Sequence, residues 1–212
     1  MNGIHTTIRL CVVLFFLLSA GCSQTSVTGV WKKSDFAGPP FRSVLVVALT
    51  GEDINKALWE NIMADQLNRS NISAVPCTQA FPRENNVTRE KIEAYVRQHA
   101  IEGMLVTRLV DTRTEQVYHP PRGVYYGGPF WYYNHFYNYY PYVYDRVYSP
   151  GYTSTHTIVL LETNLYQAAT QELVWSMSSD TFDPRSINQL VESVSKKVIQ
   201  GLRKDRLIPP AK

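Results

Sequence analysis

Several features that mark whole classes of protein are scarce in this sequence. Three cysteines among 212 residues are too few for a disulfide framework, and 11 glycines and 12 prolines without a period exclude a collagen-like chain. A net charge of +3 argues against a nucleic-acid-binding protein, because such proteins need a pronounced basic stripe to replace phosphate counterions. With 44% hydrophobic and 18% charged residues, the chain has the composition of one or at most two ordinary folded domains.

Catalytic motifs are also scarce. The chain contains no Gly-rich phosphate loop, no Cys-x-x-Cys pair and no His-Glu-x-x-His. Ser193 and Lys196 match a Ser-x-x-Lys pattern, yet the companion motifs of the penicillin-binding enzymes are missing. We therefore predict that the protein is not an enzyme and has no catalytic residue, resident metal or cofactor. The alternative is an envelope hydrolase or metal-dependent enzyme that uses His119, His135 and His156.

The amino terminus carries an export signal. One basic residue precedes an apolar run at residues 10–18, which is too short to span a bilayer that needs about 20 helical residues. The run ends in Leu18-Ser19-Ala20-Gly21-Cys22, which resembles the lipobox of bacterial lipoproteins. This resemblance implies removal of residues 1–21 and diacylglycerol modification of the Cys22 thiol, with acylation of its new amino group. The mature protein would then be anchored to a membrane without crossing it.

The residue after Cys22 indicates the membrane in which the protein is anchored. In enterobacterial sorting an aspartate there favours retention in the inner membrane, whereas this chain has Ser23. We therefore expect a lipid-anchored protein of the bacterial outer membrane that faces the periplasm. Residues 23–40 are polar and show no sustained period, so residues 22–41 are predicted to be the lipidated cysteine and a flexible tether. Cys77 has no partner cysteine left and lies beside Pro76 in an apolar stretch, which favours a small buried side chain over a nucleophile.

The first half of the mature chain alternates between strand and helix patterns. The unbroken apolar run at residues 44–49 predicts a strand buried on both faces. Ile54, Leu58 and Ile62 recur at helical spacing, and Ala57, Trp59 and Leu67 widen this apolar stripe. A later helix is expected between Thr88 and a stop at Gly103. In chain order the patterns cover residues 44–49 (strand), 54–67 (helix), 72–78 (strand), 88–100 (helix) and 104–110 (strand). This order predicts a parallel βαβαβ unit with right-handed crossovers.

The second half of the chain predicts a β-hairpin and a helix. Apolar and polar residues alternate through residues 157–166 and again through residues 173–177, with a turn between them. Asp183 and Pro184 then supply an expected N-cap and first-turn proline. The apolar stripe of the last helix consists of Ile187, Leu190, Val191, Val194, Val198 and Leu202.

These patterns together predict one α/β or α+β domain at residues 42–208, with a tail at 209–212. Its single mixed sheet should have about five strands covered by three helices. The element order, with Leu173-Val174-Trp175 and Asp183-Pro184, resembles small envelope lipoproteins of uncharacterised function. It is also similar to the α/β modules of the curli-secretion lipoprotein and of the amino-terminal domain of the Tol-Pal protein TolB. Those modules are noncatalytic parts of envelope assemblies, which implies a binding or structural role here.

One insertion into this domain, residues 118–152, is exceptionally aromatic. It holds 15 of the 26 aromatic residues of the chain, including 12 of the 14 tyrosines. We call it the Tyr-rich segment. Part of it alternates, so an extended hairpin linking two neighbouring strands is expected. The candidate binding residues are Tyr125, Tyr126, Trp131, Tyr132, Tyr133, Tyr140, Tyr142, Tyr144 and Tyr148.

Three interpretations of the Tyr-rich segment remain open. It can be a low-complexity insertion that is locally disordered or folded back on its own domain. It can be an interaction surface, because Tyr and Trp give large contact areas at low entropy cost, for an envelope protein, a second copy or a glycan. It can also contact the membrane interface, which tyrosines favour. The leading hypothesis is a noncatalytic outer-membrane lipoprotein that uses this segment to bind or scaffold an envelope partner.

Overall fold

The computed structural model describes residues 24–51, 53–82, 87–119, 136–137 and 151–210. The chain divides into two compact units, one made of Met1–Asp111 with Val159–Lys212 and the other of Thr112–Ile158. The predicted signal peptide and Cys22 lie outside the described residues. No helix among the described residues has both the length and the apolar character needed to cross a bilayer.

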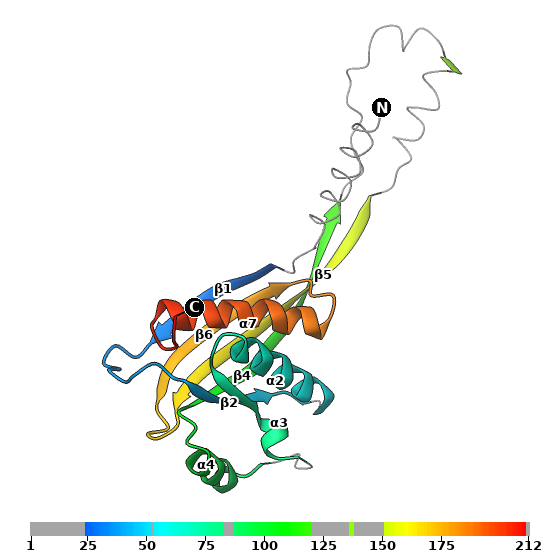
Figure 1. The fold of residues 1–212 in the computed structure, drawn as a ribbon. Coiled ribbons are helices and arrows are strands. Elements are labelled where there is room, and N and C mark those ends of the chain that lie inside the picture. Colours follow the sequence, from blue (N-terminus) through cyan, green and yellow to red (C-terminus); the bar gives the residue numbers. More distant parts are fainter. Residues whose placement is uncertain (1–23, 52, 83–86, 120–135, 138–150, 211–212) are drawn as a thin grey trace, which may run out of the picture. The chain divides into compact units, whose positions relative to one another are not determined.

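The described residues form one six-stranded mixed sheet with helices on both faces (Figure 1). The sheet order is β1-β6-β5-β4-β2-β3. The elements are β1 (Gln24–Lys32), β2 (Ser43–Leu49), α2 (Asp53–Asn68), β3 (Ser73–Pro76), α3 (Cys77–Ala80), α4 (Arg89–Gln98), β4 (Gly103–His119), β5 (Tyr152–Gln167), β6 (Leu173–Phe182) and α7 (Ile187–Lys204). The predicted α/β class is confirmed, and β2 pairs in parallel with both β3 and β4, as the βαβαβ prediction requires.

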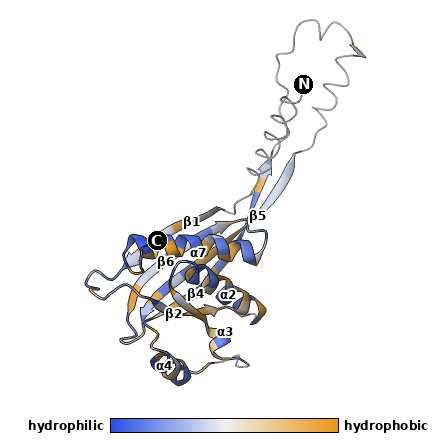
Figure 2. Cartoon of the chain, in the orientation of Figure 1, coloured by the Kyte–Doolittle hydropathy of each residue, from blue (hydrophilic) through white to orange (hydrophobic). Residues whose placement is uncertain are grey.

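Strand β2 is the point at which two hydrophobic cores meet. Val44, Val46 and Ala48 pack into the core formed with α2 and α7, whereas Leu45 belongs to the smaller core formed with α4. The apolar run therefore has no polar face, because neither face of the strand meets water. Figure 2 shows hydrophobic and hydrophilic residues mixed along α2, α4 and α7, as expected of helices with one buried side.

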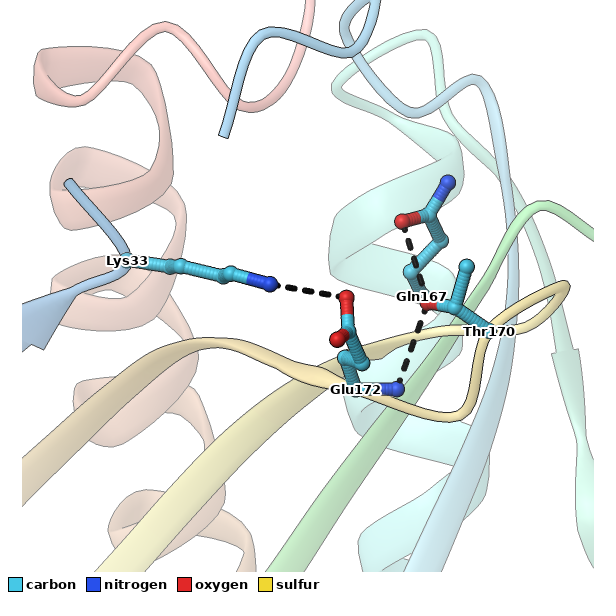
Figure 3. Close-up of polar contacts among 4 residues, drawn as sticks. All are labelled: Lys33, Gln167, Thr170 and Glu172. Carbon is cyan, nitrogen blue, oxygen red and sulfur yellow. Dashed lines mark hydrogen bonds and ion pairs between the residues drawn. The ribbon is translucent and has the colours of Figure 1, made fainter. Parts of the chain in front are cut away.

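The carboxyl-terminal half follows the predicted pattern. Strands β5 and β6 are neighbours in the sheet, and the connection between them is closed by the Gln167 N–H donating to the Glu172 carbonyl at 2.9 Å. This turn is held by further polar contacts (Figure 3): Lys33 forms an ion pair with Glu172 at 2.7 Å, and the Thr170 hydroxyl donates to Gln167 Oε1 at 3.2 Å. The predicted stripe of α7 is confirmed, with its central members buried at Val191, Val194, Val198 and Leu202.

The flexible-tether prediction is wrong for residues 24–32, which form the edge strand β1. It pairs antiparallel with β6, from Gln24 opposite Phe182 to Lys32 opposite Trp175. A polar side chain can be buried in this strand because its hydroxyl group forms hydrogen bonds with neighbouring hydroxyl groups. Thr25 is buried, lies 2.8 Å from the Thr181 hydroxyl and donates to Ser193 of α7 at 2.7 Å. The sheet therefore has six strands instead of about five.

Two helix ends also differ from the expected ones. Helix α7 begins after Ser186, whose hydroxyl accepts the Gln189 N–H at 3.2 Å, so Asp183 and Pro184 are not its cap. Helix α4 ends at Gln98 and the left-handed turn follows at Ala100, with φ of 48°, instead of at Gly103. Gly103 is already the first residue of β4. The short helix α3 was not predicted, so the described elements include four helices instead of three.

The buried face of α2 is only partly the predicted one. The predicted members Trp59 and Leu67 are buried, together with Met63, whereas Ile54 is 77% exposed and Leu58 is 37% exposed. The cause is Glu60, which is completely buried. Its Oε1 accepts the Ala48 N–H of β2 at 3.0 Å, and its Oε2 accepts the Thr78 N–H of α3 at 2.7 Å. Met63 and Ala64 lie one turn after Glu60 on the same side of the helix and are buried with it, whereas Ile54 and Leu58 are not.

Replacing Glu60 should destabilise the domain strongly. Glu60→Ala leaves the Ala48 and Thr78 N–H groups without acceptors, so we expect the free energy of unfolding to fall by about 2–4 kcal/mol in urea titration. Glu60→Gln keeps one oxygen acceptor and should lose less. The exposed Glu192→Ala on α7 is the matched control, with an expected change within about 0.5 kcal/mol. A Glu60→Ala midpoint equal to that of the wild type would contradict this role.

Candidate functional site

Strands β4 and β5 carry the Tyr-rich segment between them. They have 17 and 16 residues and are neighbours in the sheet, so the predicted link between two neighbouring strands is confirmed. The β4 residues from Thr112 onward and the β5 residues up to Ile158 belong to the second unit. The β4 residues from Thr112 to Tyr118 are exposed. Strands of ordinary length would end near the edge of the core. The extra length therefore forms a two-stranded ribbon, which we define as residues 112–119 with residues 151–158.

The described aromatic residues of the Tyr-rich segment are all well exposed. Tyr118 and Tyr152 on the ribbon are 63% and 65% exposed, and Phe136 and Tyr137 are 63% and 88% exposed. Phe136 and Tyr137 meet edge to face at 5.7 Å. Large exposed aromatic groups of this kind are more typical of contact surfaces than of a packed interior.

The nine predicted binding residues lie outside the described residues. They are Tyr125, Tyr126, Trp131, Tyr132, Tyr133, Tyr140, Tyr142, Tyr144 and Tyr148. They remain predictions, as does a role for His135, which also lies outside.

The ribbon brings two of the three singled-out histidines together. His119 Nε2 and His156 Nε2 each lie 2.9 Å from the Ser154 hydroxyl, and the His119 ring stacks on Tyr152 at 4.5 Å. Ser154 has one hydroxyl proton and two lone pairs, so it can donate to at most one of the two imidazoles and accepts from at least one. In the arrangement where it donates, one ring accepts from Ser154 and the other donates to it. A hydroxyl that donates to an imidazole is the minimal arrangement of a base-activated nucleophile.

Gly151 allows the ends of the ribbon to approach closely. A Cβ atom at this position would lie 2.8 Å from the His119 carbonyl oxygen and 2.5 Å from the Tyr118 hydroxyl. Any side chain there would push the two strands apart. Gly151 thus helps to keep His119 within hydrogen-bond distance of Ser154.

Cys77 is a buried side chain of the smaller core. It is 2% exposed, and burial, followed by the nearby negative charge of Glu60, raises the pKa of its thiol to about 11. A thiol with such a pKa carries almost no thiolate at neutral pH, which disfavours nucleophilic chemistry. Among the residues that the structure describes, no three His, Cys, Asp or Glu side chains are placed to hold one metal ion.

A groove of about 470 Å³ lies between α4 and the β5–β6 turn, and the sequence patterns did not reveal it. Its apolar lining comes from Ile92, Val96, Met104, Ala168 and Ala169. At its rim Arg89 donates to Glu93 at 2.6 Å and to Gln171 at 3.0 Å, and Gln171 donates back to Glu93 at 3.0 Å. The Arg89 hydrogen bond lowers the pKa of the Glu93 carboxyl. The i,i+4 spacing of Arg89 and Glu93 is visible in the sequence, whereas the approach of Gln171 from 78 positions away is not.

A second polar cluster lies on β4 and β5. Arg108 donates to Glu162 at 2.6 Å, and Asn164 donates to the other carboxylate oxygen at 2.6 Å. These two hydrogen bonds, that of Arg108 first, lower the pKa of the Glu162 carboxyl. The Asn164 side-chain oxygen is buried and has no hydrogen-bond partner. Glu162 and Asn164 thus lie on one polar face of β5, where Glu162 forms an ion pair with Arg108, as the alternation along this strand indicated.

Ser193 does not form a catalytic pair with Lys196. Its hydroxyl donates to the Leu190 carbonyl at 2.9 Å and accepts from Thr25, whereas Lys196 is exposed. The Ser-x-x-Lys match therefore reflects packing of β1 against α7.

Comparison with known proteins gives the following similarities. No family model and no curated protein matches the chain. A PelC dodecamer structure from Paraburkholderia phytofirmans is 16% identical, with a TM-score of 0.45 over 84% of this chain and 97% of that chain. A variant PelC dodecamer from the same organism is 18% identical, with a TM-score of 0.44 over 84% and 98%. Lipoprotein GNA1162 from Neisseria meningitidis is 12% identical, with a TM-score of 0.39 over 76% of this chain and 98% of that chain. All three TM-scores are below 0.5, so the function is argued from the residues of this chain alone.

Proposed function

We propose that the protein is a noncatalytic, lipid-anchored protein of the bacterial outer membrane that faces the periplasm and binds an envelope partner through the Tyr-rich segment. The observation that carries the binding role is the ribbon. Strands β4 and β5 each contribute residues to both units, and the Tyr-rich segment connects them. A segment that only filled the core would not need two strands of this length.

The chemistry of the segment supports a macromolecular partner. Its four described aromatic residues expose large ring surfaces, and between residues 123 and 152 only Asp145 and Arg146 carry a full charge. Tyr and Trp side chains lose little entropy on binding and dominate the energetics of protein contacts. We therefore place an envelope protein or a second copy of the chain first, and a glycan second, because sugar rings also stack on aromatic faces.

The anchor is supported by the position of the lipobox-like sequence. Leu18-Ser19-Ala20-Gly21-Cys22 precedes the first described residue, Gln24, with only Ser23 between Cys22 and the folded domain. Processing before Cys22 would thus release a chain that begins almost directly with β1. Two or three acyl chains on Cys22 hold a protein on a bilayer far more firmly than one.

A second candidate function is hydrolysis. It is favoured by one observation, the convergence of His119 and His156 on the Ser154 hydroxyl at 2.9 Å each. In this case the Ser154 oxygen would attack an acyl carbon while one imidazole takes its proton, and the leaving group would depart with that proton. Water would then hydrolyse the acyl-serine and restore the hydroxyl. The same contacts also serve a plain structural purpose, since they join the two strands of the ribbon.

Deletion of residues 123–150 should separate folding from binding. We expect the variant to keep the thermal transition of the domain, because the described core is formed by other residues, and to lose at least about tenfold of its partner capture in a crosslinking pull-down. Ile54→Ser, which changes an exposed apolar residue on α2, is the control that should capture normally. Undiminished capture by the deletion variant would exclude the Tyr-rich segment as the binding surface.

Cys22→Ala should abolish the anchor. We expect the variant to incorporate no radiolabelled palmitate in cells and to leave the membrane fraction, because the thiol that carries the acyl glyceride is gone. Cys77→Ala should incorporate label normally, since Cys77 is buried in the fold. Continued labelling of the Cys22→Ala variant would refute the lipobox assignment.

A serine-directed fluorophosphonate probe distinguishes the two candidate functions. Under the proposed noncatalytic function the purified protein should remain unlabelled, and metal analysis should find no stoichiometric zinc. Labelling that Ser154→Ala removes and Ser193→Ala leaves unchanged would establish the hydrolase instead.

A further inference from the structure

Strand β1 is an edge strand with unusual composition. Residues 24–31 contain no charged side chain, although edge strands are commonly protected by lysines and other charges. Instead, Val27, Val30 and Trp31 are 42%, 52% and 49% exposed. Phe182, which lies opposite Gln24 on β6, is 45% exposed. This row of apolar side chains along one sheet edge, defined by these four exposed residues, is the apolar edge.

The side chains of the apolar edge point to both faces of the sheet. Val27 and Val30 pair with Ser179 and Met177, whose side chains are buried on the face that α7 covers. Trp31 pairs with Ser176, whose side chain lies on the opposite face. A partner lying on only one face of the sheet could not contact all of them. A surface that meets the sheet edge-on can.

A second strand added to this edge is disfavoured by its backbone. The pairing register of β1 shifts between Val27 and Gly29, which is a β-bulge in the middle of the strand. A bulge interrupts the regular ladder of hydrogen bonds and twists the edge away from an incoming strand. The apolar edge is therefore better suited to a surface without a fixed hydrogen-bond pattern than to a second copy of β1.

The predicted anchor places such a surface next to β1. Only two Cα–Cα steps separate Cys22 from Gln24, a distance of at most about 7.6 Å. An acylated Cys22 lies at the level of the lipid headgroups, so the start of β1 and the adjoining Phe182 cannot be far from them. Trp31 then follows on the same edge, and tryptophan is enriched at the interface between lipid and water.

We infer that the apolar edge rests on the headgroup region of the bilayer, so that the domain stands edge-on on the membrane that anchors it. This inference rests on the proposed lipid anchor and adds a contact made by the folded domain itself. The contact is apolar, because none of the four residues of the apolar edge carries a charge and the nearby Lys33 is paired with Glu172. It should therefore be insensitive to salt.

Trp31 provides a direct reporter of this contact. The palmitate-labelled protein with Trp131→Phe is reconstituted into phosphatidylethanolamine and phosphatidylglycerol vesicles with and without bromine near the acyl-chain carbonyls. Trp59 and Trp175 are buried in the protein core, so a change in emission reports on Trp31. We expect brominated lipid to remove at least about half of the Trp31 emission, equally at low and high salt. The same protein with Trp31→Phe added should show no bromine-dependent quenching.

Variants separate the edge contact from the anchor. Val30→Glu should reduce the quenching because a carboxylate leaves the apolar interface. Ile54→Glu should not, because Ile54 lies on α2, which packs beside β2 and β3, and β6, β5 and β4 separate these strands from β1. Val27→Ser is a milder edge variant should Val30→Glu unfold. Labelled protein without Trp31 quenching overturns the inference while the anchor stands. If Trp31 is then also shielded from aqueous acrylamide, a second protein copy covers the edge instead. Absence of palmitate label refutes the anchor and the edge contact together.

Discussion

The buried carboxylate of Glu60 is the interaction on which the parallel half of the fold depends. Strand β3 pairs with β2 only as far as Pro76 opposite Val46, so the next N–H of β2 on that side, from Ala48, has no strand partner. Glu60 supplies the acceptor there and also accepts the Thr78 N–H in the first turn of α3. The N-cap residue of α3 is Pro76, whose side chain has no acceptor for this N–H. One side chain of α2 thus completes β2 and begins α3, which fixes the helix against the sheet.

This constraint shows where sequence patterns succeed and where they fail. The β2 strand and the buried stripe of α7 could be predicted because burial of their residues follows from the local spacing of apolar side chains. The α2 face was predicted only in part, because hydrophobicity ranks Ile54 and Leu58 above Glu60, although Glu60 is the residue with buried partners. Those partners lie 12 and 18 positions away, beyond the reach of a helical pattern.

The candidate site likewise has features that the sequence predicts and features that it does not. The aromatic composition and the link between neighbouring strands were evident from residues 118–152 alone. The convergence of His119 and His156 on Ser154 was not, because it depends on which residues of two long strands lie opposite each other. Strand β1 was missed for a related reason: its bulge breaks the period of two, and its hydroxyl partners lie more than 150 positions away. Long-range pairing is the information that a single sequence carries least visibly.

The short sequence distance between Cys22 and β1 has a mechanical consequence. If Cys22 is held in a bilayer, a pull on the domain is not absorbed by slack chain but acts within two residues on the first pairs of the β1–β6 ladder. The load is then borne first by the hydroxyl groups of Thr25, Thr181 and Ser193, which join the strand to α7. Detachment by force would begin with peeling of β1 from the sheet, and the hydroxyl chain would act as the first resistance to that peeling.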